Sequence, residues 1–220
     1  MLNDMRYKAF LFDMDGTLID SMPTFASVIL NILDDKGFEY QDDFIKIITP
    51  LGLKGTADYC IQQGLDISQQ EMLSLMIENM KGEYANNIPA KSNVISTLKS
   101  LKEYGYSLNV LTASPHDTLD PCLKRLGVWK LFDFIWSCED FGTTKSDANI
   151  YRMAAEQIGV DIAEILFLDD NCNACLSAKN AGIGVCGVYD ESSAEYEAEM
   201  RSITDLYIKD FSELMRFAPQ

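Results

Sequence analysis

Five strand-length apolar runs recur along this chain of 220 residues, and segments with a helical period separate them. Each run is apolar almost throughout rather than at alternate positions, which is typical of strands whose two faces are both covered. Alternation of such strands with helices predicts a doubly wound parallel sheet. The predicted strands are residues 7–12, 107–111, 134–137, 165–168 and 184–188, and the predicted helices of this part are residues 94–104, 117–126, 148–158 and 174–180.

Residues 21–87 interrupt this alternation, because they carry helical patterns and no run that we assign to a strand. Ser21 and Ser68 stand where helix N-caps are expected, and Gly37 and Gly64 stand where helices should end. A run of helices placed after the first strand indicates an inserted lobe rather than a part of the sheet. The predicted helices of this lobe are residues 23–35, 42–48, 56–63 and 69–84.

We therefore predict two domains. The first is a Rossmann-like α/β core with a doubly wound parallel sheet, made of residues 1–20 and 88–220, and the second is an inserted all-helical cap domain of residues 21–87. Within the core, we expect residues 192–218 to form two helices around a short apolar piece at residues 206–208. Ligands of such sheets bind at the carboxyl ends of the strands.

The composition is acidic, with 34 acidic and 18 basic residues and a formal net charge of −16. This balance disfavours nucleic acids and anionic membranes as partners. No apolar run approaches the roughly 20 residues that span a bilayer, and we identify no signal peptide. Among six cysteines only Cys172 and Cys175 form a Cys-x-x-Cys pair, and nothing completes a zinc site. We expect reduced, packed thiols in a cytoplasmic protein, with a monomer as the default state.

Polar side chains follow the predicted strands at the points where those strands should end. In a parallel sheet such residues converge on one rim. Several carboxylates around one crevice cannot all stay ionised without a cation, and their oxygens are the ligands that Mg²⁺ prefers. The residues are Asp13 and Asp15 after the first strand, Thr112 and Ala113 after the second, Lys145 in the loop after the third, and Asp169 and Asp170 after the fourth.

A divalent metal beside a carboxylate and a lysine indicates phosphoryl transfer. Asp13 would attack phosphorus and form an aspartyl-phosphate, while Mg²⁺ and Lys145 offset the charge repulsion. The Thr112 hydroxyl and the Ala113 backbone N–H would hold the non-reacting phosphate oxygens. Asp15 would protonate the leaving oxygen and then activate the attacking water.

These residues resemble the motifs of the haloacid dehalogenase superfamily of phosphohydrolases. The resemblance covers nearly the whole chain, and its first motif is the most specific. The helical insert is similar to the subgroup with a small α-helical cap, which includes phosphoglycolate phosphatase-like enzymes and β-phosphoglucomutase. The matching segments are Phe-Asp-Met-Asp-Gly-Thr-Leu-Ile-Asp-Ser at residues 12–21, Leu111-Thr112, Lys145, and Leu-Asp-Asp-Asn at residues 168–171 running on to Ala181-Gly182.

The resemblance implies how these residues share the chemistry. Asp13, the backbone carbonyl of Asp15, and Asp170 would bind Mg²⁺, and Asp169 would contribute secondarily or through water. The dehalogenases and the phosphonate-cleaving relatives lack an acid at the position of Asp15, so its presence favours phosphate esters. The third motif departs from the family pattern, because Lys145 is followed by Ser-Asp-Ala-Asn and lacks the two usual prolines.

Hydrolysis has a mutase as its nearest alternative. The segment 53–58, Leu-Lys-Gly-Thr-Ala-Asp, resembles the cap loop of β-phosphoglucomutases, but Asp58 stands where their phosphate-gripping arginine is found. The histidine of their first cap helix meets Phe25 here. Both differences favour a phosphatase acting on a small phosphorylated metabolite such as phosphoglycolate, a sugar phosphate or a nucleotide. A non-catalytic phosphoester-binding regulator would be expected to have lost the reacting acids, which this chain keeps.

Substrate selection would come from the cap, which in this subgroup acts as a lid. The candidate residues are Lys54, Thr56, Asp58 and Tyr59, although each is equally compatible with an ordinary position on a cap helix. His116, the single histidine, follows the second motif, where we expect a surface loop position rather than a substrate contact.

Overall fold

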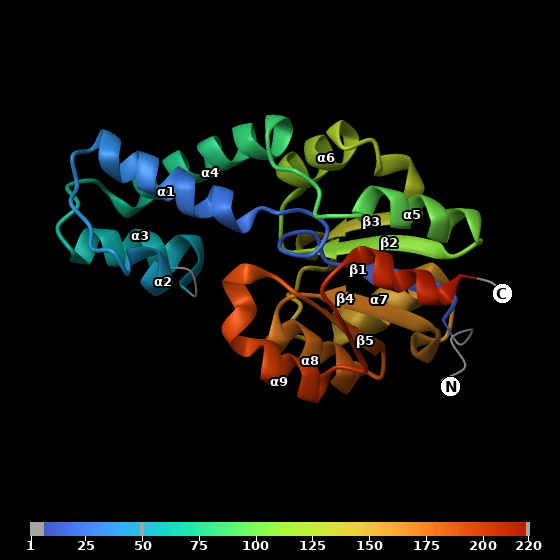
Figure 1. Cartoon of the computed structure of the whole chain (residues 1–220). Helices are drawn as coiled ribbons and strands as arrows, with labels where there is room; N and C mark the ends of the chain where they lie inside the picture. The colour runs from blue at the N-terminus through green and yellow to red at the C-terminus, as the bar shows by residue number, and fades with distance from the viewer. Residues whose placement is uncertain (1–6, 49–50, 219–220) are drawn as a thin grey trace. The chain divides into compact units, whose positions relative to one another are not determined.

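The core of the protein is a six-stranded, wholly parallel sheet (Figure 1). The computed structural model describes residues 7–48 and 51–218. The strand order is β3-β2-β1-β4-β5-β6, so the first strand is central and the chain winds outward from it in both directions. The strands are β1 (Ala9–Phe12), β2 (Ser107–Thr112), β3 (Phe134–Ser137), β4 (Ile165–Asp169), β5 (Gly184–Val188) and β6 (Leu206–Ile208). The predicted doubly wound sheet is therefore confirmed.

Both faces of β1 are buried, which explains why its sequence does not alternate between apolar and polar residues. Phe10 packs edge-on against Phe217, and Phe12 stacks near Phe211, with ring centroids 5.5 and 6.2 Å apart. Ala9 and Leu11, which alternate with them along the strand, belong to the cluster on the opposite face, together with Tyr151 and side chains of the helix that follows β4. The central strand thus holds two hydrophobic layers together.

Helices of the core connect successive strands (Figure 1). Short 3₁₀ helices supplement them at Trp129–Leu131, Cys138–Phe141, Ile162–Glu164, Glu191–Tyr196 and Phe211–Phe217. No helix within residues 7–48 and 51–218 has the length and apolar character needed to cross a membrane. The α-helices are α5 (Val94–Glu103), α6 (His116–Arg125), α7 (Asn149–Ile158), α8 (Cys172–Ala181) and α9 (Glu197–Ile203).

The segment between β1 and β2 is helical, as predicted. It forms a second compact unit, Ser21–Ile88, whose helix α4 buries Met72, Met76, Met80 and Tyr84 at a spacing of four residues. The unit consists of α1 (Met22–Asp35), α2 (Phe44–Ile48), α3 (Gly52–Gln62) and α4 (Gln69–Asn86). These bounds include most of each predicted helix, with α3 beginning four residues earlier than expected.

Three of the four predicted helix boundaries in this unit have the expected chemistry. The Ser68 hydroxyl accepts a hydrogen bond from the Glu71 backbone N–H, which caps α4. Gly37 and Gly64 follow α1 and α3 with φ values of 64° and 104°, a region that favours glycine. The prediction for Ser21 is wrong in its mechanism, because its backbone is helical and its buried hydroxyl bonds no described residue.

The C-terminal stretch has the predicted order, with one helix on each side of the short apolar piece. The short apolar piece is the sixth strand, because Leu206–Ile208 pairs in parallel with residues 186–188 of β5. The second predicted helix is of the 3₁₀ type, Phe211–Phe217. Its buried residues Phe211, Leu214 and Phe217 are three apart, and a helix with three residues per turn places them on one face against the sheet.

Candidate active site

The carboxyl ends of the central strands bring the predicted acidic residues together. Asp13 directly follows β1, Asp169 ends β4, and Asp170 comes next along the chain. One carboxylate oxygen from each of the three lies within 4.8 Å of the others. Asp13 and Asp169 are buried, and Asp170 is partly exposed. This acidic cluster is the centre of the candidate site.

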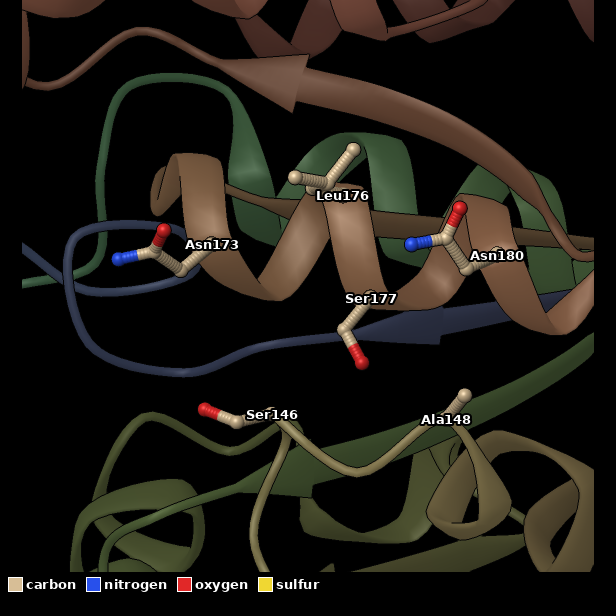
Figure 2. Close-up of a pocket in the computed structure, with 6 residues that line it drawn as sticks. All are labelled: Ser146, Ala148, Asn173, Leu176, Ser177 and Asn180. Atoms are coloured by element: carbon tan, nitrogen blue, oxygen red, sulfur yellow. The ribbon is translucent and has the colours of Figure 1, made fainter.

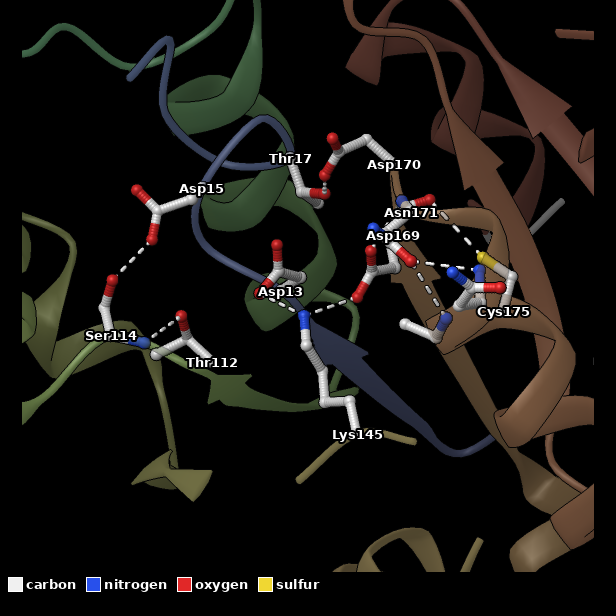
Figure 3. A network of polar contacts seen from close by, with 12 residues as sticks. Asp13, Asp15, Thr17, Thr112, Ser114, Lys145, Asp169, Asp170, Asn171 and Cys175 are labelled. Atoms are coloured by element: carbon white, nitrogen blue, oxygen red, sulfur yellow. Dashed lines mark hydrogen bonds and ion pairs between the residues drawn. The ribbon is translucent and has the colours of Figure 1, made fainter. Parts of the chain in front are cut away.

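Lys145 lies between two of these acids (Figure 3). Its Nζ donates to Asp13 Oδ1 and to Asp169 Oδ2, both at 2.6 Å. The backbone carbonyl of Lys145 accepts from the Tyr151 hydroxyl at 2.9 Å, and the same hydroxyl is 3.0 Å from the Ala174 carbonyl. Tyr151 therefore holds the loop of Lys145 in place. This loop lacks the two prolines that are usual in the third motif of the haloacid dehalogenase superfamily.

The buried charges of this cluster do not balance. Burial, together with the carboxylates of Asp169 and Asp15, raises the pKa of Asp13 to about 7, although Lys145 opposes the shift. Burial and the neighbouring carboxylates also raise the pKa of Asp170 well above its usual value. Burial disfavours the charged form of Lys145, yet Asp13 and Asp169 outweigh it and raise the pKa of the ammonium.

This excess of negative charge fits a hard divalent cation. One lysine faces three converging carboxylates, and carboxylate oxygens are ligands that Mg²⁺ and similar ions prefer. A bound cation would supply the missing positive charge and favour the ionised carboxylates. The donor set, which contains oxygen atoms only, gives no reason to expect zinc.

The loop after β1 turns sharply beneath Asp170. Gly16 adopts a φ of 73°, and a Cβ atom added to it would lie only 2.5 Å from Asp170 Oδ2. Thr17 donates its hydroxyl to Asp170 Oδ1 at 3.1 Å. A glycine is therefore required at residue 16 both for the backbone conformation and for the close approach of the acid.

We expect Gly16→Ala to weaken divalent-metal binding about tenfold, because the added methyl group displaces Asp170. The strained φ should also lower stability by about 1–2 kcal/mol. Isothermal titration with Mg²⁺ and thermal unfolding measure the two effects. Gly127→Ala is the matched control, since Gly127 has a φ of 72° with no atom near its Cβ position. Equal loss of metal affinity in both variants would show that backbone strain alone is responsible.

Asp15 points away from Asp13 (Figure 3). Its Oδ2 accepts a hydrogen bond from the Ser114 hydroxyl at 2.6 Å. The Ser114 backbone N–H donates to Thr112 Oγ1 at 3.1 Å, which leaves the hydroxyl proton of Thr112 able to donate. Ser114 thus links Asp15, in the loop after β1, to Thr112, the last residue of β2. Ala113 lies between Thr112 and Ser114 in the sequence.

Three residues of the site were given no role from the sequence. Thr17 and Ser114 bond predicted site residues, and Tyr151 anchors the loop of Lys145. A signal was available for two of them, because Thr17 lies inside the first motif and Ser114 follows Thr112 of the second motif by two residues. Tyr151 offered none, because a tyrosine on an amphipathic helix usually packs in the core.

The predicted cap residues have different surroundings within the helical unit. The buried Thr56 hydroxyl donates to the Ile48 carbonyl, and Asp58 accepts from the Gln69 side chain. The ring of Tyr59 packs 6.0 Å from that of Phe44. Lys54 is exposed, and it is the one of the four without such a contact among the described residues.

His116 is the first residue of α6, and its ring lies between two carboxylates. Its ring nitrogens lie 2.8 Å from Asp120 on the same helix and 2.8 Å from Asp140 in the 3₁₀ helix after β3. Its side chain is 42% exposed, so the predicted surface position is confirmed, but the residue begins a helix rather than lying in a loop. Hydrogen bonds to Asp120 and Asp140 raise the pKa of His116 despite partial burial. The residue therefore stabilises the fold in its charged form.

We expect His116→Gln to lower Tm at pH 5.5 and to have little effect at pH 9. A raised folded-state pKa means that the stabilisation is complete below the unfolded value of about 6.5. It is lost as pH rises through the folded-state pKa. Because the pair is partly exposed, the effect should stay below about 1 kcal/mol. Thermal unfolding at both pH values measures it, and a Tm difference that does not vary with pH would contradict it.

A surface pocket of about 370 Å³ lies outside the acidic cluster (Figure 2). The Ser177 hydroxyl points away from its own helix, α8, toward the segment that carries Ser146 and Ala148, and it is buried without a partner among the described residues. None of the lining side chains is charged. The lining residues are Ser146, Ala148, Asn173, Leu176, Ser177 and Asn180.

The protein is thus of the α/β class, with a lysine-bridged acidic cluster at the carboxyl edge of its doubly wound sheet. The chain belongs to the haloacid dehalogenase-like hydrolases, whose family model matches residues 10–188. Within this family it is a phosphatase-type hydrolase, with an α/β core, a helical insertion and an acidic site.

Similar proteins include several phosphatases. Pyrophosphatase PpaX of Bacillus velezensis is 30% identical over 190 residues, which cover 85% of this chain and 85% of the relative. A phosphoglycolate phosphatase of Haemophilus influenzae is 25% identical over 193 residues, covering 83% of this chain and 86% of that protein.

Solved structures share the fold. The structure of a protein provisionally assigned as a β-phosphoglucomutase from Thermotoga maritima superposes with a TM-score of 0.83, at 20% identity and with 96% of this chain and 100% of that chain covered. A predicted phosphoglycolate phosphatase from Haemophilus somnus gives a TM-score of 0.81 at 22% identity, with 97% and 99% covered. These similarities confirm the architecture.

Proposed function

We propose that the protein is a Mg²⁺-dependent phosphatase that hydrolyses a small phosphomonoester through a phosphorylated Asp13. The observation that carries the proposal is the Lys145 ammonium, 2.6 Å from both Asp13 and Asp169 within the buried acidic cluster. A carboxylate held against one cation, beside further oxygen ligands for a divalent ion, suits attack on an anionic phosphate. Asp15, held to one side by Ser114, is available for proton transfer.

The two half-reactions use these side chains in turn. A carboxylate oxygen of Asp13 forms a bond to phosphorus, the bond from phosphorus to the ester oxygen breaks, and Asp15 gives its proton to the departing alcohol. Water then attacks phosphorus and passes a proton to Asp15, and the bond from phosphorus to the Asp13 oxygen breaks. Inorganic phosphate leaves, and both acids return to their starting state. Lys145, the Thr112 hydroxyl and the Ala113 N–H offset the charge on the phosphate oxygens.

Asp13, Asp170 and the backbone carbonyl of Asp15 would hold Mg²⁺, with Asp169 contributing secondarily or through water. When bound, the ion neutralises phosphate and carboxylate charge in the transition state. Asp169 already accepts from the Asn171 N–H at 2.7 Å and from Lys145, which suits a supporting role.

The helical unit would act as the cap that selects the substrate. Pyrophosphate is a second candidate substrate, because a relative at 30% identity is named a pyrophosphatase. A mutase remains the alternative reaction, but Asp58, engaged with Gln69, offers no cation for the second phosphate of a bisphosphate. Lys54 is the exposed cation of the candidate segment and suits contact with an anionic substrate.

We expect the purified protein to release phosphate from small phosphomonoesters only when Mg²⁺ is present. A panel of phosphoglycolate, sugar phosphates, nucleotides, p-nitrophenyl phosphate and pyrophosphate, ranked by kcat/KM, tests the substrate class. EDTA should abolish turnover and excess Mg²⁺ should restore it. Undiminished turnover in EDTA would refute the mechanism. Conversion of β-glucose 1-phosphate to glucose 6-phosphate, primed by the bisphosphate, would favour the mutase.

A further inference from the structure

Lys91 connects the loop after β1 to the end of β5 through one partly buried ammonium group. Its Nζ donates to the backbone oxygens of Gly16 at 2.7 Å and Tyr189 at 2.6 Å, and to Asp190 Oδ2 at 2.9 Å. The Lys91 side chain is 18% exposed and that of Asp190 is 4% exposed. An ammonium group has three protons, so these three contacts use its full donor capacity.

The backbone of Lys91 holds the same loop at a second point. Its N–H donates to the Leu18 carbonyl at 3.0 Å. Within the loop, the Gly16 N–H donates to the Ile19 carbonyl at 3.0 Å. The Asp15 carbonyl and the Gly16 N–H belong to one planar peptide group, so these bonds also fix the direction of that carbonyl.

Gly16 links this anchor to the acidic cluster. Its α-carbon lies so close to Asp170 that an added Cβ would be 2.5 Å from Oδ2. Movement of Gly16 would therefore displace both the Asp170 carboxylate and the Asp15 carbonyl. We propose that Lys91 is a positioning residue for the metal site, which it serves by holding Gly16; this inference rests on the proposed Mg²⁺-dependent function.

Asp190 supplies the counter-charge for this ammonium group. Its Oδ1 also accepts from the Ser192 backbone N–H at 3.0 Å and from the Ser192 hydroxyl at 2.5 Å, so the carboxylate is itself held in place. Lys91 thus has two separable effects, since it neutralises a buried acid and it holds a backbone carbonyl. Replacing Asp190 removes the first effect and leaves the second.

Four variants of the full chain separate these effects by Mg²⁺ titration calorimetry and thermal unfolding. Lys91→Met should lower Tm, because Asp190 is left buried without its cation. The double variant, Lys91→Met with Asp190→Asn, should recover most of the lost Tm. The single Lys91→Met variant and the double variant should both bind Mg²⁺ at least about tenfold more weakly than the wild type. Asp190→Asn alone should bind Mg²⁺ nearly as the wild type does. Lys102→Met is the control. Lys102 pairs with Asp133, which directly precedes β3 and so lies at the amino ends of the strands, away from the acidic cluster.

The double variant decides the question. Wild-type Mg²⁺ affinity in Lys91→Met combined with Asp190→Asn would overturn the positioning role and leave Lys91 as a structural residue. Amide exchange in the metal-free protein gives a second readout, in which residues 14–19 should exchange faster in the double variant. Unchanged exchange there would also contradict the proposal. Failure of the wild-type protein to bind Mg²⁺ would instead refute the proposed function, and the inference with it.

Discussion

Asp13→Asn is expected to reduce kcat for phosphomonoester hydrolysis about 10⁴-fold or more, with the fold intact. The neutral amide of asparagine is too weak a nucleophile to form the phosphorylated intermediate. The asparagine side chain has nearly the same shape as the aspartate side chain, so the fold should be kept. Lys145 retains its contact with Asp169, so the variant leaves no buried cation alone. Steady-state turnover of p-nitrophenyl phosphate with Mg²⁺ measures the loss.

The stability of the same variant tests the electrostatic description. Because burial raises the pKa of Asp13 to about 7, its ionised form is disfavoured in the folded protein without metal. The stabilisation associated with its bound proton is present at low pH and is lost as pH rises through the folded-state value. The asparagine side chain carries no charge, so at pH 8 and without metal the Tm of Asp13→Asn should equal or exceed that of the wild type.

Controls for Asp13→Asn address the chemistry and the fold separately. Mass spectrometry of acid-quenched wild-type protein should detect one added phosphoryl group during turnover, and the variant should show none. Asp66→Asn, at an exposed position of the helical unit, should leave kcat unchanged. Residual activity within tenfold of the wild type would exclude Asp13 as the nucleophile.

The parallel sheet and its acidic edge were predictable because both depend on local sequence patterns. Runs such as Ile165–Leu168 bury both faces, and the acids that follow them must meet at the carboxyl edge once the sheet is parallel. The same argument places Asp13 and Asp169 together without any knowledge of side-chain conformation.

Features that depend on contacts between distant segments were not predictable. Lys91 is an ordinary lysine in the sequence, and its three acceptors come from residues 75, 98 and 99 positions away. The strand β6 has only three residues, too few for its pattern to be distinguished from a loop. Thr56 resembles a surface residue of a cap loop, yet tertiary packing buries it and directs its hydroxyl to Ile48.

Lys145→Met should affect both catalysis and stability. Without the ammonium group, kcat should fall about 10²–10³-fold, because one stabilising contact to the transition-state charge is lost. Asp13 and Asp169 would remain buried without their shared cation, since their side chains are 6% and 0% exposed. Removing one partner from such a buried cluster typically costs about 3–5 kcal/mol. For a chain of this size the metal-free Tm should fall by roughly 6–20 °C.

Mg²⁺ distinguishes charge imbalance from lost packing in this variant. If unpaired carboxylates cause the instability, saturating Mg²⁺ should raise the Tm of Lys145→Met more than that of the wild type, because the ion replaces the missing positive charge. Adding Asp169→Asn should recover part of the metal-free Tm without restoring kcat. A Tm deficit that persists equally with Mg²⁺ and in the double variant would indicate that the aliphatic part of Lys145, rather than its charge, holds the site together.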